Sequence, residues 1–146
     1  MFMATTWIVA ADESRARVLQ VTDREQRLTE VESLLNPSGR LQDREIESDA
    51  RDRFPGGNSW EPRLGAVEHG NELFAKRVGD YLDQARQDRR YDQLVLVAPP
   101  KFLGALRKEL HKEVEKLVAD ELPKDLSWLN ARELERYFAK GSGRAP

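Results

Sequence analysis

The chain of 146 residues contains no cysteine and only two histidines. The absence of cysteine excludes disulfide bonds, thiolate nucleophiles, iron–sulfur clusters and cysteine-ligated zinc. His69 and His111 are too few for a multi-histidine metal site. The chain also has no excess of one charge, because 24 Lys and Arg residues stand against 26 Asp and Glu residues, for a formal net charge of −2. A protein that coats nucleic acid through overall positive charge is therefore excluded, whereas a local basic patch is not.

Long hydrophobic runs are missing as well. The longest strongly apolar run covers residues 94–100, far below the roughly 18–20 residues of a membrane-spanning helix. The N-terminal residues lack both the basic region and the long apolar region of an export signal. We therefore expect a cytoplasmic protein that contacts no membrane, with one domain over residues 1–140 and a flexible tail at residues 141–146.

Three short segments rich in Val, Ile and Leu predict β-strands in the first part of the chain. They cover residues 6–11, 16–21 and 28–35, and the polar residues between them favour turns, so we expect an antiparallel meander. Residues 36–65 lack a hydrophobic period, and Pro55, Gly56, Gly57 and Pro62 exclude a continuous helix there. We predict a long loop over this stretch, of the kind that often carries function.

The second half of the chain alternates helical and strand patterns. Apolar residues recur at helical spacing over residues 66–90 and 101–121, and a continuous apolar run at residues 94–98 predicts a buried strand between these helices. Gly70 and Gly79 indicate close packing of the first helix on the sheet. Residues 126–129 predict a short edge strand. Asn130 and Glu133 have the spacing of a capping box at the start of a last helix.

This pattern predicts an α/β fold with a ribonuclease H-like mixed sheet and the element order βββ-αβαβα. Enzymes of that fold hold metal ions with clustered carboxylates. Here Asp12 follows the first strand, and only Glu68 or Glu72 from the first helix could join it. A metal-dependent hydrolase or nuclease that uses Asp12 with Glu68 or Glu72 is therefore one alternative function. The other interpretation of Asp12 is a hairpin residue whose side chain forms hydrogen bonds within its own turn. No motif of a nucleophilic enzyme and no cofactor motif is present.

Basic residues gather along the second predicted helix. If residues 101–121 form one continuous helix, its lysines lie on one side and can meet phosphates, or else they form a solvated helix face. Arg15 and Arg17 would extend this patch if the first hairpin lies beside Pro99 and Pro100. The basic residues of the helix are Lys101, Arg107, Lys108, Lys112 and Lys116.

Several stretches, in order along nearly the whole chain, resemble a known bacterial family. The most specific is Ala98-Pro99-Pro100-Lys101-Phe102-Leu103-Gly104. On these residues the chain is similar to the host attachment protein family, whose members are described as required for attachment to host cells. The other stretches are Trp7–Asp12 with Ser14–Arg17, Gly39–Leu41 with Ser48-Asp49, Phe74-Ala75 with Tyr81-Leu82, Tyr91–Val97, and Lys124–Leu126 with Ala131–Leu134.

The resemblance implies a fold similar to the middle domain of archaeo-eukaryotic peptide-chain release factors. It also implies a binding module, rather than an enzyme, whose partner is the ribosome or structured RNA. In release factors a Gly-Gly-Gln loop helps water to attack the peptidyl-tRNA ester, and the stretch Gly56-Gly57-Asn58 is similar except for its Asn. The remaining alternative is a protein-interaction module in which residues 40–62 dock a partner.

Overall fold

The computed structural model describes residues 4–22, 27–37 and 60–141. In these ranges the chain is a mixed α/β fold with a sheet of five strands in the order β3-β2-β1-β4-β5. The strands are β1 (Thr6–Ala11), β2 (Arg15–Val21), β3 (Leu28–Leu35), β4 (Gln93–Val97) and β5 (Val118–Leu122). β2 runs antiparallel to β1 and β3, whereas β4 runs parallel to β1 and β5.

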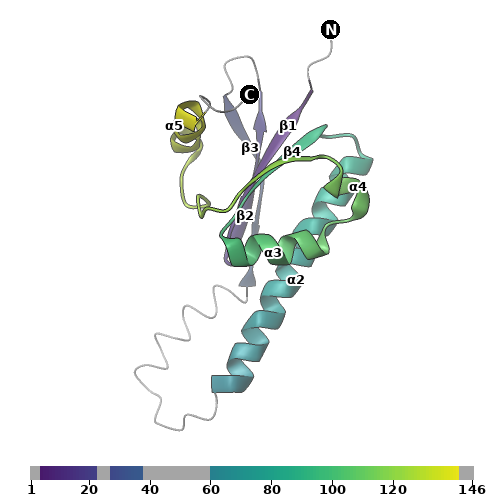
Figure 1. Ribbon diagram of the computed structural model, residues 1–146, viewed down its shortest axis with the longest axis vertical. Coiled ribbons are helices and arrows are strands. Elements are labelled where there is room, and N and C mark those ends of the chain that lie inside the picture. Colours follow the sequence, from purple (N-terminus) through teal and green to yellow (C-terminus); the bar gives the residue numbers. More distant parts are fainter. Residues whose placement is uncertain (1–3, 23–26, 38–59, 142–146) are drawn as a thin grey trace.

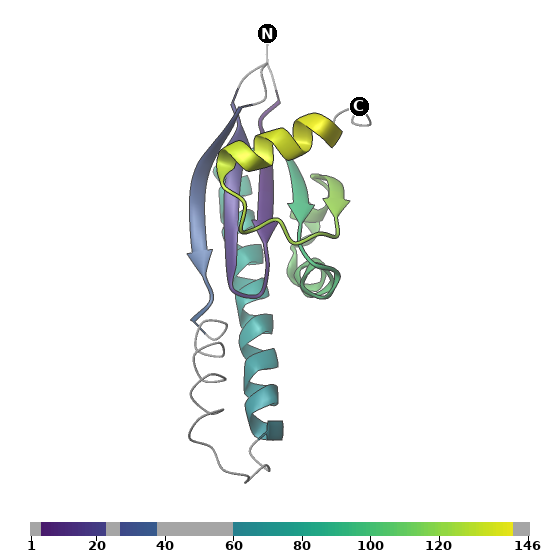
Figure 2. The same ribbon diagram turned by 90° about the vertical axis from the view of Figure 1, so that its left-hand side faces the viewer.

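Helices cover both faces of this sheet. One face carries α2 (Trp60–Gln87), α3 (Pro100–Glu109) and the single turn α4 (Lys112–Glu115), and the other carries α5 (Ala131–Gly141) (Figures 1 and 2). Among the described helices, none combines the length and apolar character that crossing a bilayer requires.

The predicted meander is confirmed. β1 and β3 have the predicted bounds, β2 begins one residue earlier than expected, and β4 is displaced by one residue. Successive side chains of β1 point to opposite faces of the sheet. Trp7 and Val9 face the core under α2 and α3, whereas Ile8 and Ala10 face the core under α5. Since both faces are buried, β1 and β4 read as continuous apolar runs.

The prediction of one helix over residues 101–121 is wrong. Leu110 adopts an extended backbone with φ −73° and ψ 137°, which ends α3. After α4, residues 118–122 form β5, which pairs with β4. In this pairing Val118 of β5 lies opposite Leu94 of β4. The hydrophobic period does not reveal this break, because Leu106, Leu110 and Val114 are buried on both sides of it.

Residues 126–129 do not form the predicted edge strand. β5 already occupies the edge of β4, and residues 127–129 lie in a turn instead. The predicted capping box of α5 is confirmed, because Asn130 Oδ1 accepts from Glu133 N at 2.8 Å and Glu133 Oε1 accepts from Asn130 N at 2.8 Å.

α2 begins at Trp60, earlier than the predicted start at residue 66, so part of the predicted loop is helical. Pro62 is compatible with this start because the first turn of a helix needs no backbone N–H. Arg89 follows the helix with φ 60°, and Arg90 N donates to Ala85 O at 3.0 Å, as in a Schellman ending. The remainder of the predicted loop, including Gly56-Gly57-Asn58, lies outside the described residues.

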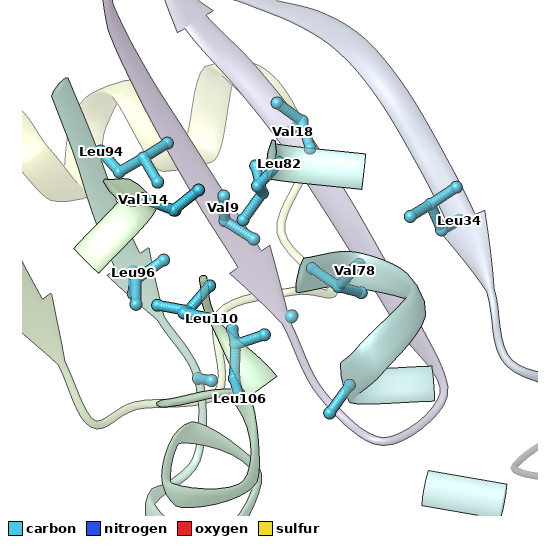
Figure 3. Close-up of a cluster of buried hydrophobic side chains, with 14 of the residues drawn as sticks. Val9, Val18, Leu34, Val78, Leu82, Leu94, Leu96, Leu106, Leu110 and Val114 are labelled. Atoms are coloured by element: carbon cyan, nitrogen blue, oxygen red, sulfur yellow. The ribbon is translucent and has the colours of Figure 1, made fainter. Parts of the chain in front are cut away.

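The larger core fills the space between the sheet and helices α2 and α3 (Figure 3). It contains side chains from strands and helices far apart in the sequence, among them Val9, Leu82, Leu96 and Leu106, all almost fully buried. A smaller core under α5 includes Ile8, Leu19, Leu126 and Leu134. Both cores contain side chains of β1 and β4, whose ends carry the polar residues described below.

Gly79 packs against α3, not against the sheet as expected. A Cβ atom added there would lie 2.7 Å from the carbonyl oxygen of Glu109. The missing side chain therefore lets α2 approach the last turn of α3 closely.

Candidate functional site

The parallel strands β1, β4 and β5 end at one edge of the sheet, which we call the carboxyl edge. The register sets this alignment, because Ala10 pairs with Val97 and Val97 pairs with Leu122. Three segments leave the sheet there: the β1–β2 turn, the start of α3 and residues 123–130. The first hairpin therefore lies beside Pro99 and Pro100, which is the condition under which Arg15 and Arg17 would extend the basic patch. Ligands of α/β sheets bind beyond the carboxyl ends of the strands, so this edge is the candidate site.

Asp12 joins two of these segments. Its Oδ1 accepts hydrogen bonds from Ser14 N at 2.7 Å and Arg15 N at 2.9 Å, as in a turn stabilised by its own side chain. Ser127 Oγ lies 2.9 Å from Asp12 Oδ2 and 3.0 Å from Asp125 Oδ1, so its one proton is shared between two carboxylates. The interpretation of Asp12 as a hairpin residue is confirmed.

The carboxylates proposed as its metal-binding partners are engaged elsewhere or solvated. Glu68 is exposed on α2, and Glu72 is an exposed neighbour of His69, with 3.9 Å between Oε1 and Nδ1. Within residues 4–22, 27–37 and 60–141, no group of three or more His, Asp or Glu residues could hold a metal ion. The arrangement therefore does not favour the metal-dependent alternative.

Arg17 does not belong to the exposed basic surface, because it is only 9% exposed. Its Nη1 donates to Ser127 O at 3.0 Å and to Leu129 O, and its Nη2 donates to Glu30 Oε1 at 3.1 Å. The guanidinium thus ties the 127–129 turn to β2 and β3. Its role in the described fold is structural.

The other predicted basic residues divide into paired and unpaired cations. Arg107 forms an ion pair with Glu121, which raises the pKa of its guanidinium through a hydrogen bond. Because α3 ends at Glu109, Lys112 lies on α4 and the single lysine stripe predicted for one helix is split. Among the residues predicted from the sequence, the following are exposed and form no ion pair with a described residue: Arg15, Lys101, Lys108 and Lys112.

The start of α3 adds to this positive surface. Pro99 is the N-cap and offers no side-chain hydrogen bond, proline occupies the first turn, and no acidic residue lies there. Helix N-termini carry partial positive charge from unpaired N–H groups, and here no carboxylate of the first turn offsets it. Lys101 lies in this turn and is exposed.

Two residues near these elements were not anticipated from the sequence. Trp128 is 65% exposed on the turn that Arg17 holds, and its Nε1 donates to Asp125 O at 3.0 Å. The only feature of the sequence that could have indicated this residue is that a single Trp stands among turn-forming residues. His111 is exposed at the N-cap of α4 and contacts α2, with Nε2 3.1 Å from Asp80 Oδ1. That hydrogen bond lowers the pKa of Asp80.

A family profile described as "Protein required for attachment to host cells" matches residues 7–138. The chain belongs to this family. The match extends from β1 into α5 and therefore includes the whole sheet and its carboxyl edge. The family assignment made from Ala98–Gly104 and the other matching stretches of the sequence is thus confirmed.

Two curated proteins are similar to this family member over part of its length. "Uncharacterized protein RP470" of Rickettsia prowazekii (strain Madrid E) is 30% identical over 82 residues, which cover 55% of this chain and 55% of that protein. A glutamine synthetase of Pyrococcus horikoshii is 34% identical over 71 residues, which cover 49% of this chain and 16% of the enzyme. The match thus spans about half of the first relative and a small part of the second.

Two solved structures are similar at low identity. An archaeal translation termination factor aligns with a TM-score of 0.48 and 13% identity, over 95% of this chain and 42% of that one. The type II variant of the Aquifex aeolicus Ppx/GppA phosphatase aligns with a TM-score of 0.43 and 10% identity, over 82% and 36% of the two chains. The first belongs to the class that the sequence resemblance implies, but neither alignment indicates what the chain binds.

Proposed function

We propose that this member of the host attachment family is a cytoplasmic module that binds structured RNA, with the ribosome as its principal partner. The observation that carries the proposal is that four of the basic residues predicted to bind, Arg15, Lys101, Lys108 and Lys112, are exposed and form no ion pair with a described residue. Lys101, Lys108 and Lys112 lie on α3 and α4, which cover one face of the sheet (Figure 1), and Arg15 lies in the β1–β2 hairpin at the carboxyl edge, so the cations are spread over several elements rather than gathered at one point. A chain of phosphates fits such a spread better than a single small anion.

A ribonuclease H-like fold is part of this proposal. The strand order β3-β2-β1-β4-β5, with β2 antiparallel to its two neighbours, is the arrangement expected from a meander followed by βα units. In such a sheet the carboxyl edge is the natural binding surface. Arg15 and Lys101 both lie beside that edge.

The electrostatics give the proposal a measurable size. With a net charge of −2 the whole molecule is not attracted to polyanions, so binding must come from the local cations. If each of the four neutralises one phosphate, affinity falls roughly 50- to 150-fold between about 50 and 200 mM salt. A protein partner docked through apolar contacts would show no such loss.

Co-sedimentation with bacterial ribosomes across a salt series tests the proposal. The charge-reversed variant Lys101→Glu/Lys108→Glu should lose most of its binding. The matched control Lys116→Glu/Arg136→Glu changes the net charge by the same amount but alters a lysine already paired with Glu113 and an arginine of α5. It should bind nearly as the unaltered protein does. Equal binding by both variants, or salt-independent binding, would contradict an RNA interface at this surface.

A further inference from the structure

Among the large hydrophobic side chains whose exposure the structure describes, Trp128 is the most exposed. It is 65% exposed, compared with 53% for Leu73 and 47% for Leu35. Fully burying a large apolar side chain stabilises a protein by about 1.5–3 kcal/mol, and the fold forgoes much of that gain here. The indole is nevertheless oriented, because its Nε1 donates to Asp125 O at 3.0 Å.

The turn beneath this indole is held from below by buried groups. Ser127 is completely buried, and its carbonyl and that of Leu129 both accept hydrogen bonds from Arg17. Leu129 N also donates to Leu126 O at 3.1 Å, which closes the turn. Trp128 is therefore presented to solvent from a fixed support rather than from a loosely attached loop.

The same support connects Trp128 with a free cation. Asp12 accepts hydrogen bonds from the backbone of Arg15 and from Ser127 Oγ, so one carboxylate joins the two turns. Arg15 and Arg17 are two residues apart on β2, and their side chains therefore lie on the same face of the sheet, the face that the 123–130 segment crosses (Figure 2). Lys124, on that segment, is also exposed, and its Nζ lies 5.6 Å from the centroid of the Tyr137 ring on α5.

An exposed aromatic ring beside cations is the arrangement by which proteins bind single-stranded nucleic acid, with the base stacked on the ring and phosphates near the cations. A protein-binding hot spot instead lies in a patch that a partner desolvates completely. Here the neighbours Lys124, Asp125 and Asn130 are exposed and polar. We propose that Trp128 is a stacking platform for one unpaired base of the RNA, an inference that rests on the function proposed above.

Binding of a fluorescently labelled single-stranded RNA of twelve nucleotides, compared with a duplex of the same length, tests this inference. Trp128→Ala should weaken single-strand binding roughly 5- to 150-fold, the loss expected when one base no longer stacks on a ring. Trp128→Phe should retain most of the affinity because a ring remains. Duplex binding should be unchanged in both variants, since a paired base cannot stack on the indole. Circular dichroism and the melting temperature serve as controls for folding.

The salt dependence separates stacking from charge. Trp128→Ala removes no phosphate contact, so the slope of log affinity against log salt should stay as in the unaltered protein, whereas Arg15→Ala should reduce it by about 1. If Trp128→Ala binds single strands normally while Lys101→Glu/Lys108→Glu fails, the stacking inference is wrong and the proposed function stands. A changed slope in Trp128→Ala would point to a distorted turn and contradict stacking. Absence of any RNA or ribosome binding by the unaltered protein would overturn both proposals.

Discussion

The close approach of α2 and α3 at Gly79 gives a quantitative test of the packing. A methyl group at this position would lie 2.7 Å from the backbone carbonyl oxygen of Glu109, a contact that cannot relax by a side-chain rotation. Gly104, inside α3, is the matched control because a methyl group there meets no atom within 4 Å. Replacement by alanine is thus the same chemical change in two helices, with a clash in only one.

The two substitutions share the same gain in helix propensity and differ in the packing energy of the added methyl group. Alanine is favoured over glycine inside a helix by about 0.8–1.0 kcal/mol, so Gly104→Ala should stabilise the protein by about that amount. Gly79→Ala gains the same helix propensity but overpacks the contact with Glu109, which costs about 1–3 kcal/mol. Gly79→Ala should therefore be about 1–3 kcal/mol less stable than Gly104→Ala, a difference of about 2–12 °C in melting temperature for a chain of this size.

Urea denaturation followed by circular dichroism measures both free energies of unfolding. Unchanged m-values would show that the two variants expose the same surface on unfolding. If Gly79→Ala proves as stable as Gly104→Ala, the helices are not in the close contact described here. The packing of α3 against α2, and with it the placement of Lys101 and Lys108, would then be refuted.

Two further substitutions test the carboxyl edge and the α2–α4 junction. Ser127→Ala should lower the free energy of unfolding by about 1–3 kcal/mol, because Asp12 Oδ2 and Asp125 Oδ1 lose the buried hydroxyl that bridges them; an unchanged urea midpoint would contradict that bridge. The hydrogen bond from His111 lowers the pKa of Asp80, so the stability contributed by the ionised carboxylate is present above its ordinary pKa and is lost as the pH falls through the lowered folded value. Asp80→Asn cannot titrate, and its free energy of unfolding should therefore fall less between pH 5 and pH 2 than that of the unaltered protein. Chemical denaturation at both pH values measures this, and identical pH dependences would argue against the contact.

The strands of the meander could be predicted because each one carries its own signal. Short segments rich in Val, Ile and Leu and the polar turns between them are local features, and they locate β1, β2 and β3 to within a residue. The capping box at Asn130 is equally local, since both of its hydrogen bonds join residues three apart. Such features need no knowledge of the rest of the fold.

The errors concern residues whose environment is set by distant parts of the chain. Val118–Leu122 becomes a strand because it completes the edge of β4, and nothing in its own pattern distinguishes it from the end of a helix. Arg17 is buried because carbonyl groups about 110 residues away accept its hydrogen bonds. A basic residue on a strand is otherwise expected to be exposed, so its structural role could not be inferred from type or spacing.

The same limit applies to the candidate site. The paired state of Arg107 depends on β5, which supplies Glu121, whereas Lys101 and Lys108 form no ion pair with a described residue. The exposure of Trp128 depends on the turn that Arg17 and Ser127 hold. Sequence alone indicated which residue types were present, whereas the fold decides which of them are available to a ligand.

The most direct test of the RNA interface is the salt dependence of ribosome binding by the unaltered protein and by Lys101→Glu/Lys108→Glu. Four phosphate contacts predict a slope of log affinity against log salt of about −3 to −4, and the variant should lose roughly half of it. A slope near zero, or one that the two substitutions leave unchanged, would contradict the proposed interface.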